Sequence, residues 1–263
     1  MPFAESNGAR FNYQFDGPAE APVLVLSNSL GTNLSMWDPQ MPAITTRFRV
    51  LRYDTRGHGP SSVTPGPYSV TQLGRDVIGL LDTVGVECGH FCGLSMGGMT
   101  GMWLGVYAPD RINRLVLCNT AAKIGTAETW TARLEMVRAQ GMSAVAATQA
   151  QRWFTPKFIA ASPGIVESTK KIIASTSVEG YLANCGAIRD ADQRATISRI
   201  QAPTLVIAGL HDPVIPAADI RYLVDTIPGA KLLELDASHL SNVEAAEQFT
   251  KALTNFLTEP EAK

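Results

Sequence analysis

The sequence predicts an α/β fold in which a mostly parallel central sheet is flanked by helices. Short, uninterrupted apolar runs, typical of strands buried on both faces, alternate with segments of helical periodicity. One interval, residues 120–196, breaks this alternation with several helical patterns and no strand-like run. The chain has 263 residues, 45% of them hydrophobic and 17% charged, which fits one globular domain with an insertion or at most two domains.

Taken in order along the chain, the apolar runs predict strands over 23–26, 48–53, a run that ends at Leu94, 115–118, 204–208 and 231–235. Helical spacing predicts helices over 73–84 and 98–107. A last helix is expected over 245–257, with one apolar face formed by Phe249, Leu253, Phe256 and Leu257.

The interval 120–196 is expected to be all-helical. Thr126 is a suitable N-cap for a helix that carries Trp130, Leu134 and Val137 on one face and ends at Gly141. Further helices are expected over 165–174 and 178–188. Because the interval leaves from the end of a strand, we interpret it as a cap over the carboxyl edge of the sheet rather than a bundle packed behind it. The predicted organisation is a core domain of residues 1–119 and 197–263 and a helical cap of residues 120–196.

Charge and composition exclude several classes of function. The net charge of −2 gives no reason to expect a nucleic acid or a membrane as a partner, and no apolar run approaches the length of a membrane span. The first residues lack the pattern of a signal peptide, and the four cysteines show neither metal-ligand spacing nor a disulfide framework. We therefore expect a cytoplasmic protein without metal or cofactor. Nothing in the sequence indicates its oligomeric state.

The most informative motif is Gly93-Leu94-Ser95-Met96-Gly97, which spells G-x-S-x-G between a predicted strand and a predicted helix. In this context the motif predicts a nucleophile elbow, a strained bend that exposes a serine hydroxyl above the sheet. The glycines two residues before and after Ser95 let strand and helix approach closely. A chance match in a glycine-rich turn is the alternative, and the partners found downstream argue against it.

A serine nucleophile needs a base, usually a histidine held by a carboxylate. Among the four histidines, only His239 follows a predicted strand end and also comes after a suitably placed acid. That acid is Asp212, in the loop after the strand 204–208. The spacing predicts a catalytic triad of Ser95, Asp212 and His239. Alternatively, Asp212 forms a turn before Pro213 and His239 neighbours a helix cap.

The oxyanion of an acyl-transfer intermediate needs two N–H donors. One is expected from Met96, directly after the nucleophile, and the other from the loop after the strand 23–26. In that loop Leu30 is the favoured donor and Ser29 the near alternative. Leu30 as plain core remains open, since its side chain can pack while its amide serves.

These residues resemble the α/β-hydrolase superfamily, whose members carry the triad in the order Ser95, Asp212, His239. The resemblance extends over nearly the whole chain, including the turn 54–61 and the acid loop 209–216. Asn28 and Ser29 stand where most relatives have a His-Gly pair. With the loop 28–38 and the elbow, this variant resembles the 3-oxoadipate enol-lactonase family. The resemblance implies hydrolysis of a carboxylate-bearing enol-lactone in bacterial aromatic catabolism, the β-ketoadipate pathway, without metal or cofactor. The spacing alone supports only ester-type hydrolysis.

A small anionic lactone as substrate calls for a cation in the pocket. Arg133 is the first candidate, because it shares a helix face with Trp130, which would form an aromatic wall. Lys123 is the second candidate, and Trp153 is a candidate for the pocket lining. The cap interval holds nine basic and six acidic residues, a bias that favours anions. Each of these side chains also has an ordinary interpretation as a solvated cation or a cap-core aromatic.

Other functions on the same fold stay open. Within enzymes these are a carboxylesterase, a perhydrolase or a carbon–carbon bond hydrolase. Haloalkane dehalogenases and epoxide hydrolases are disfavoured, because they carry an aspartate where Ser95 stands. A different class is a receptor that keeps the hydrolase fold and signals by binding a partner.

Overall fold

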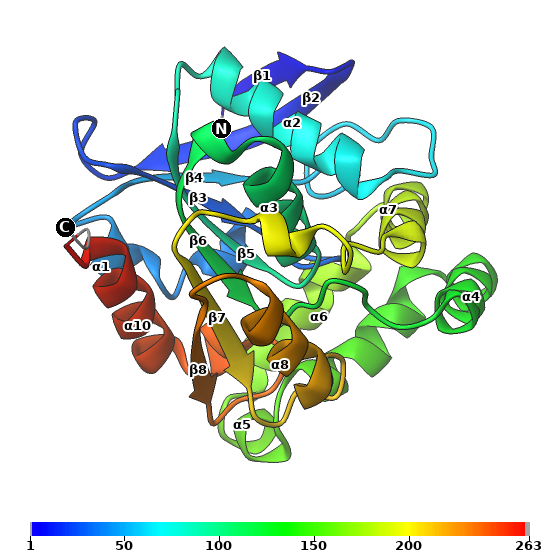
Figure 1. The fold of residues 1–263 in the computed structure, drawn as a ribbon. Helices are drawn as coiled ribbons and strands as arrows, with labels where there is room; N and C mark the ends of the chain where they lie inside the picture. Colours follow the sequence, from blue (N-terminus) through cyan, green and yellow to red (C-terminus); the bar gives the residue numbers. More distant parts are fainter. Residues whose placement is uncertain (1, 261–263) are drawn as a thin grey trace.

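The computed structural model describes residues 2–260, in which an eight-stranded sheet runs through the molecule (Figure 1). The strand order is β1-β2-β4-β3-β5-β6-β7-β8. Neighbouring strands from β4 to β8 are parallel, whereas β1 and β2 pair antiparallel at one edge. The predicted mostly parallel sheet is therefore confirmed. The strands are β1 (Phe3–Ser6), β2 (Ala9–Asp16), β3 (Val23–Ser27), β4 (Arg49–Tyr53), β5 (Gly89–Leu94), β6 (Ile112–Cys118), β7 (Thr204–Gly209) and β8 (Lys231–Leu235).

Helices cover both faces of the sheet, as strands without a polar face require. α2, α3 and α8 lie on one face, and α1 and α10 pack together on the other (Figure 1). The apolar face expected of the last helix is buried in α10. These helices are α1 (Met41–Ile44), α2 (Val70–Thr83), α3 (Met96–Tyr107), α8 (Ala217–Thr226), α9 (Ser241–Glu244) and α10 (Ala246–Thr258), with 3-10 turns η1 (Leu34–Trp37), η2 (Pro109–Arg111) and η3 (Ile197–Arg199).

Several elements were absent from the sequence-based expectation, among them the hairpin of β1 and β2 and the helix α8. β2 lies near the edge of the sheet and interrupts its apolar residues with polar ones, so it lacks the continuous run of a central strand. α8 buries only Ile220 and Leu223 among its ten residues. Weakly buried elements leave weak patterns, which explains both omissions.

Between β6 and β7 the chain forms the four helices of the predicted cap: α4 (Ala127–Trp153), α5 (Pro156–Ala161), α6 (Pro163–Ala174) and α7 (Val178–Asp190). Thr126 caps α4 as expected, in a reciprocal capping box with Thr129. Gly141 has a φ of +70° and interrupts the helical conformation, but a second helical half continues to Trp153. None of the helices that residues 2–260 form has both the length and the apolar character needed to cross a membrane.

The cap helices lie next to loops at the carboxyl ends of the parallel strands. A Cβ on Gly180 of α7 would lie 2.2 Å from the carbonyl oxygen of Gly57, in the loop after β4. The ring of Trp153, at the end of α4, lies 6.0 Å from that of His239, after β8. These contacts support the interpretation of residues 120–196 as a cap over this edge.

Candidate active site

Ser95 stands at the bend between β5 and α3, in a backbone conformation that few residues other than glycine adopt. Its φ is +57° and its ψ is −112°, a strain on the order of 1–3 kcal/mol for a residue with a Cβ. The end of β6 holds it in place. The N–H of Ser95 donates to the carbonyl of Cys118 at 2.9 Å, and its carbonyl accepts from Oγ1 of Thr120 at 2.7 Å. The strained bend predicted from the motif is therefore present.

The two glycines of the motif are required by close backbone contacts. A Cβ on Gly93 would lie 2.2 Å from the carbonyl oxygen of Gly97. A Cβ on Gly97 would lie 2.3 Å from the carbonyl oxygen of Ser27, at the end of β3. Both distances are far inside van der Waals contact, so a larger residue at either position would displace the bend.

Asp212 and His239 form a buried hydrogen-bonded pair in the loops after β7 and β8. His239 Nδ1 lies 2.8 Å from Asp212 Oδ2, and each side chain is only 2% exposed. Burial acts to raise the pKa of the Asp212 carboxyl, but the charge and hydrogen bond of His239, with further hydrogen bonds, lower it overall. Because a carboxylate can only accept, Nδ1 carries a hydrogen, and in the neutral imidazole Nε2 then has a free lone pair. Among the described residues, neither Nε2 nor Ser95 Oγ has a hydrogen-bond partner.

The link between this pair and the elbow is made by two residues that sequence reasoning missed. Asn119 and Thr120 follow β6, and Asn119 Nδ2 donates to Asp212 Oδ2 at 3.0 Å. Thr120 holds the carbonyl of Ser95, as described above. One polar dipeptide thus contacts both the elbow and the acid. Its position at the carboxyl end of a strand next to the elbow was the available signal.

The backbone amides of Leu30 and Met96 are free to bind a ligand. Both residues are buried, yet neither N–H donates to any group in the described part of the chain. Unpaired N–H groups in buried residues are rare in folded proteins, so two of them beside the elbow are notable. The loop is fixed relative to the elbow, because the Gly97 N–H donates to the Asn28 carbonyl at 3.1 Å. Both residues expected to supply oxyanion donors therefore have an available N–H.

The four cap residues singled out from the sequence lie in different environments. Arg133 is half-buried, and within residues 2–260 its guanidinium hydrogen-bonds only to neutral groups, the Tyr181 hydroxyl at 3.3 Å and Gln149 Oε1 at 3.4 Å. Lys123 is 40% exposed and lies 3.4 Å from the carboxylate of Asp192. The charge of Arg133 is therefore less neutralised by its neighbours than the charge of Lys123.

Arg133 lies close to the loop that carries Leu30. The tyrosine that it contacts, Tyr181, packs over this loop, since a Cβ on Gly31 would lie 3.2 Å from Tyr181 Cε2. Trp130, on the same helix as Arg133, is half-buried and donates its indole N–H to the Ile124 carbonyl. Trp153 is buried against His239, and its indole N–H has no partner in the described chain.

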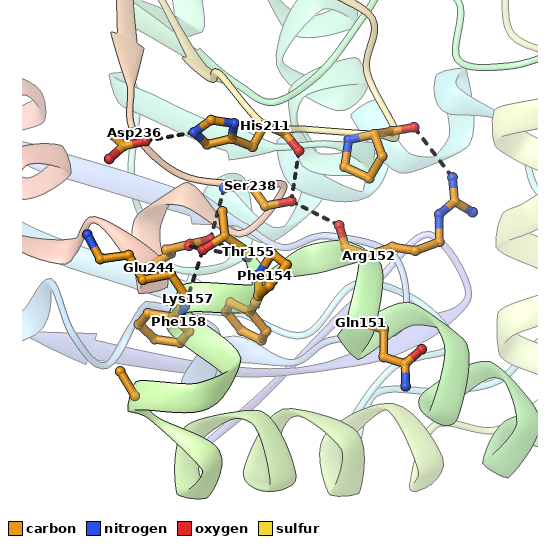
Figure 2. Close-up of a pocket in the computed structure, with 13 residues that line it drawn as sticks. Gln151, Arg152, Phe154, Thr155, Lys157, Phe158, His211, Asp236, Ser238 and Glu244 are labelled. Carbon is orange, nitrogen blue, oxygen red and sulfur yellow. Dashed lines mark hydrogen bonds and ion pairs between the residues drawn. The ribbon is translucent and has the colours of Figure 1, made fainter.

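A cavity of about 680 Å³ lies where the end of α4 and α5 meet the loops after β7 and β8 (Figure 2). Its wall includes Ser238, whose Oγ donates to the carbonyl of Arg152 at 2.9 Å. Glu244 accepts from the N–H of Ser238 at 2.9 Å and from the N–H of Thr155 at 3.2 Å. These bonds tie the end of α4 to the loop that carries His239. Residues 2–260 contain no group of three or more His, Cys, Asp and Glu side chains that could hold a metal ion.

The family to which this fold belongs follows from comparison with known proteins. Residues 22–246 match the model of the alpha/beta hydrolase fold family. The chain belongs to this family. The fold class expected from the sequence is confirmed.

The relatives of this α/β-hydrolase include two enol-lactonases of Acinetobacter baylyi. It is 50% identical over 242 residues to 3-oxoadipate enol-lactonase 2, covering 92% of this chain and 91% of the relative. It is 41% identical over 250 residues to 3-oxoadipate enol-lactonase 1, covering 95% and 94%. The crystal structure of the enol-lactonase from Burkholderia xenovorans LB400 superposes with a TM-score of 0.97 at 48% identity, covering 98% of this chain and 100% of that one. The resemblance inferred from the motifs is confirmed.

Proposed function

We propose that this α/β-hydrolase opens 3-oxoadipate enol-lactone to 3-oxoadipate by serine catalysis, as a step in bacterial aromatic catabolism. The observation that carries the reaction class is the buried hydrogen bond between Asp212 and His239, which leaves His239 Nε2 free at the edge of the sheet where Ser95 lies. The similarity to two relatives named 3-oxoadipate enol-lactonases, and to the crystal structure of an enol-lactonase, supports the substrate.

The first half of the reaction forms an acyl-enzyme. His239 Nε2 takes the proton of Ser95 Oγ, and Oγ attacks the lactone carbonyl. The resulting oxyanion accepts hydrogen bonds from the free amides of Leu30 and Met96. When the intermediate collapses, the bond between the carbonyl carbon and the ring oxygen breaks, and His239 returns its proton to the departing enol oxygen.

The second half releases the product. The enol stays attached to the enzyme through the acyl chain, and its tautomerisation to a ketone draws the ring opening forward. His239 then takes a proton from water, whose oxygen attacks the ester carbonyl of the acyl-enzyme. Collapse of this second intermediate returns the proton to Ser95 Oγ and frees the linear keto-diacid.

The carboxylate of the lactone is assigned to Arg133. Arg133 is half-buried, and the hydrogen bonds that its guanidinium forms in the described chain go to neutral groups. One of these groups belongs to Tyr181, which packs over Gly31 in the Leu30 loop. A planar guanidinium can form two parallel hydrogen bonds to a carboxylate. Trp130, Trp153 and Lys123 are proposed as pocket residues in weaker roles, Lys123 because it already pairs with Asp192.

The test compares kcat/KM for 3-oxoadipate enol-lactone with kcat/KM for neutral p-nitrophenyl esters. We expect rapid turnover of the lactone and a clear preference for it over the neutral esters. Equal or better turnover of neutral esters would identify a general carboxylesterase instead. Slow turnover of both, with ligand-dependent capture of a partner, would identify a receptor.

A further inference from the structure

The backbone of Leu30 is held from both sides by side chains. The orientation of a backbone N–H is set by the peptide planes that meet at neighbouring Cα atoms, since only φ and ψ can rotate. Two planes meet at the Leu30 Cα: Ser29–Leu30 and Leu30–Gly31. In each of them, one polar group is bonded to a side chain, that of Thr32 in the same loop or that of His58 in the loop after β4.

Thr32 fixes the first plane. The carbonyl of Ser29 accepts from Oγ1 of Thr32 at 2.8 Å and from the N–H of Thr32 at 3.2 Å. In a trans peptide the carbonyl and the N–H point in opposite directions. The Leu30 N–H is therefore directed away from Thr32 and is left unpaired.

His58 fixes the second plane. The N–H of Gly31 donates to His58 Nε2 at 2.8 Å, and His58 Nδ1 faces the carbonyl of Arg56 at 3.4 Å. Nε2 can accept only while it carries no proton, so the imidazole is neutral with its hydrogen on Nδ1. Burial lowers the pKa of His58 to about 4, against a weaker opposing effect of the Arg56 carbonyl, which keeps the ring neutral near pH 7.

His58 is itself positioned by the cap. It belongs to the loop after β4, and the carbonyl of Arg56 in that loop accepts from Nδ2 of Asn184 in α7 at 2.8 Å. Thr176, just before α7, also donates to the Gly31 carbonyl at 3.3 Å. The cap therefore contacts both the loop that carries His58 and the loop that carries Leu30.

We propose that His58, with Thr32, is a positioning residue that aims the Leu30 N–H at the oxyanion. The proposal rests on the proposed function, because it needs Leu30 to be an oxyanion donor. Complete loss of one such donor typically lowers the rate about 100- to 1,000-fold. A donor that is present but misdirected is expected to cost about 10- to 100-fold.

The test replaces His58 by Leu, which removes the acceptor, and by Gln, whose side-chain oxygen can take the place of Nε2. For hydrolysis of the enol-lactone and of p-nitrophenyl acetate, we expect His58→Leu to lower kcat about 10- to 100-fold with KM within about twofold. His58→Gln should recover most of this loss. His90→Leu is the matched control, because His90 is also buried, also has its pKa lowered to about 4 and lies at the amino end of β5.

A second pair of variants keeps the test valid if His58→Leu does not fold. Thr32→Val removes Oγ1 at nearly constant shape and should lower kcat in the same way, whereas Thr32→Ser should retain it. Phenylboronic acid, whose adduct with Ser95 mimics the oxyanion, should bind the Leu and Val variants more weakly in proportion to their loss of kcat. A structural role alone would not produce that proportionality.

The two proposals can fail separately. Retention of kcat within twofold by His58→Leu and Thr32→Val, or an equal loss in His90→Leu, would overturn the positioning role alone. If both variants fold and the kcat of His58→Gln is no higher than that of His58→Leu, the positioning role is overturned as well. Full activity of Ser95→Ala would overturn the proposed function instead.

Discussion

Replacement of Arg133 by Met removes the cation of the cap while keeping most of the apolar length of the side chain. The two hydrogen bonds of the guanidinium are long, 3.3 and 3.4 Å, and both go to neutral groups. Their loss should change the free energy of unfolding little, because hydrogen bonds of this length are weak. The main effect should fall on the binding of an anionic substrate.

The size of that effect follows from the environment of Arg133. Two unit charges about 4 Å apart at an effective dielectric constant of about 20 attract by roughly 4 kcal/mol. Because Arg133 is only half-buried, desolvation and screening remove about half of this, which leaves about 2 kcal/mol. A difference of that size corresponds to about a 30-fold loss in kcat/KM for the lactone. A neutral ester should lose less than about threefold.

The assay measures steady-state kcat/KM on the enol-lactone and on p-nitrophenyl acetate for the wild-type chain, Arg133→Met and Arg138→Met. Arg138 is the matched control, because it is exposed on the same half of α4. Equal losses on both substrates, or the same lactone-specific loss in Arg138→Met, would refute the assignment of the carboxylate to Arg133.

Three further outcomes are expected. Ser95→Ala should lower lactone turnover at least about 1,000-fold with an unchanged melting temperature. Turnover by this variant at the wild-type rate would remove Ser95 from the mechanism. Asn119→Leu should lower kcat about 10-fold and leave KM nearly unchanged, because it removes a donor to Asp212; an effect on KM alone would argue against this role. The free energy of unfolding should fall as the pH drops from 6.5 towards 4, because His58 and His90 stay neutral in the folded state while the unfolded chain takes up protons. In urea titrations at several pH values His90→Leu should take up one proton fewer on unfolding, and an unchanged slope would contradict the assignment.

The central strands and the order Ser95, Asp212, His239 were predictable, because buried strands and strand-end loops are local patterns. The strand β5 is buried along its whole length, and each of the paired glycines of the elbow avoids a backbone clash. The N-cap Thr126 and the break in the helix at Gly141 were also predictable, although α4 resumes after the glycine.

Other parts of the site depend on contacts that no local pattern reveals. Asn119 matters because β6 ends beside both the elbow and the acid loop, and His58 because its loop lies against Gly31. Both contacts depend on strand order. The sequence favoured Arg133 over Lys123 as the cation for the substrate but did not show that Lys123 pairs with Asp192, since only the fold brings the two together.

The cap is attached to the core at both of its ends. At one end, Ser238 Oγ donates to the carbonyl of Arg152, and Glu244 of α9 accepts from the N–H groups of both Ser238 and Thr155. At the other end, α7 is hydrogen-bonded to the loop after β4 through Asn184. A movement that lifted the whole cap as one lid would break both attachments. Bending at Gly141 would spare them, but it would break the hydrogen bonds that join Arg133, on the first half of α4, to Tyr181 of α7 and to Gln149 on the second half. The described contacts thus hold Arg133 in place relative to the loop that carries Leu30, because Tyr181 touches both.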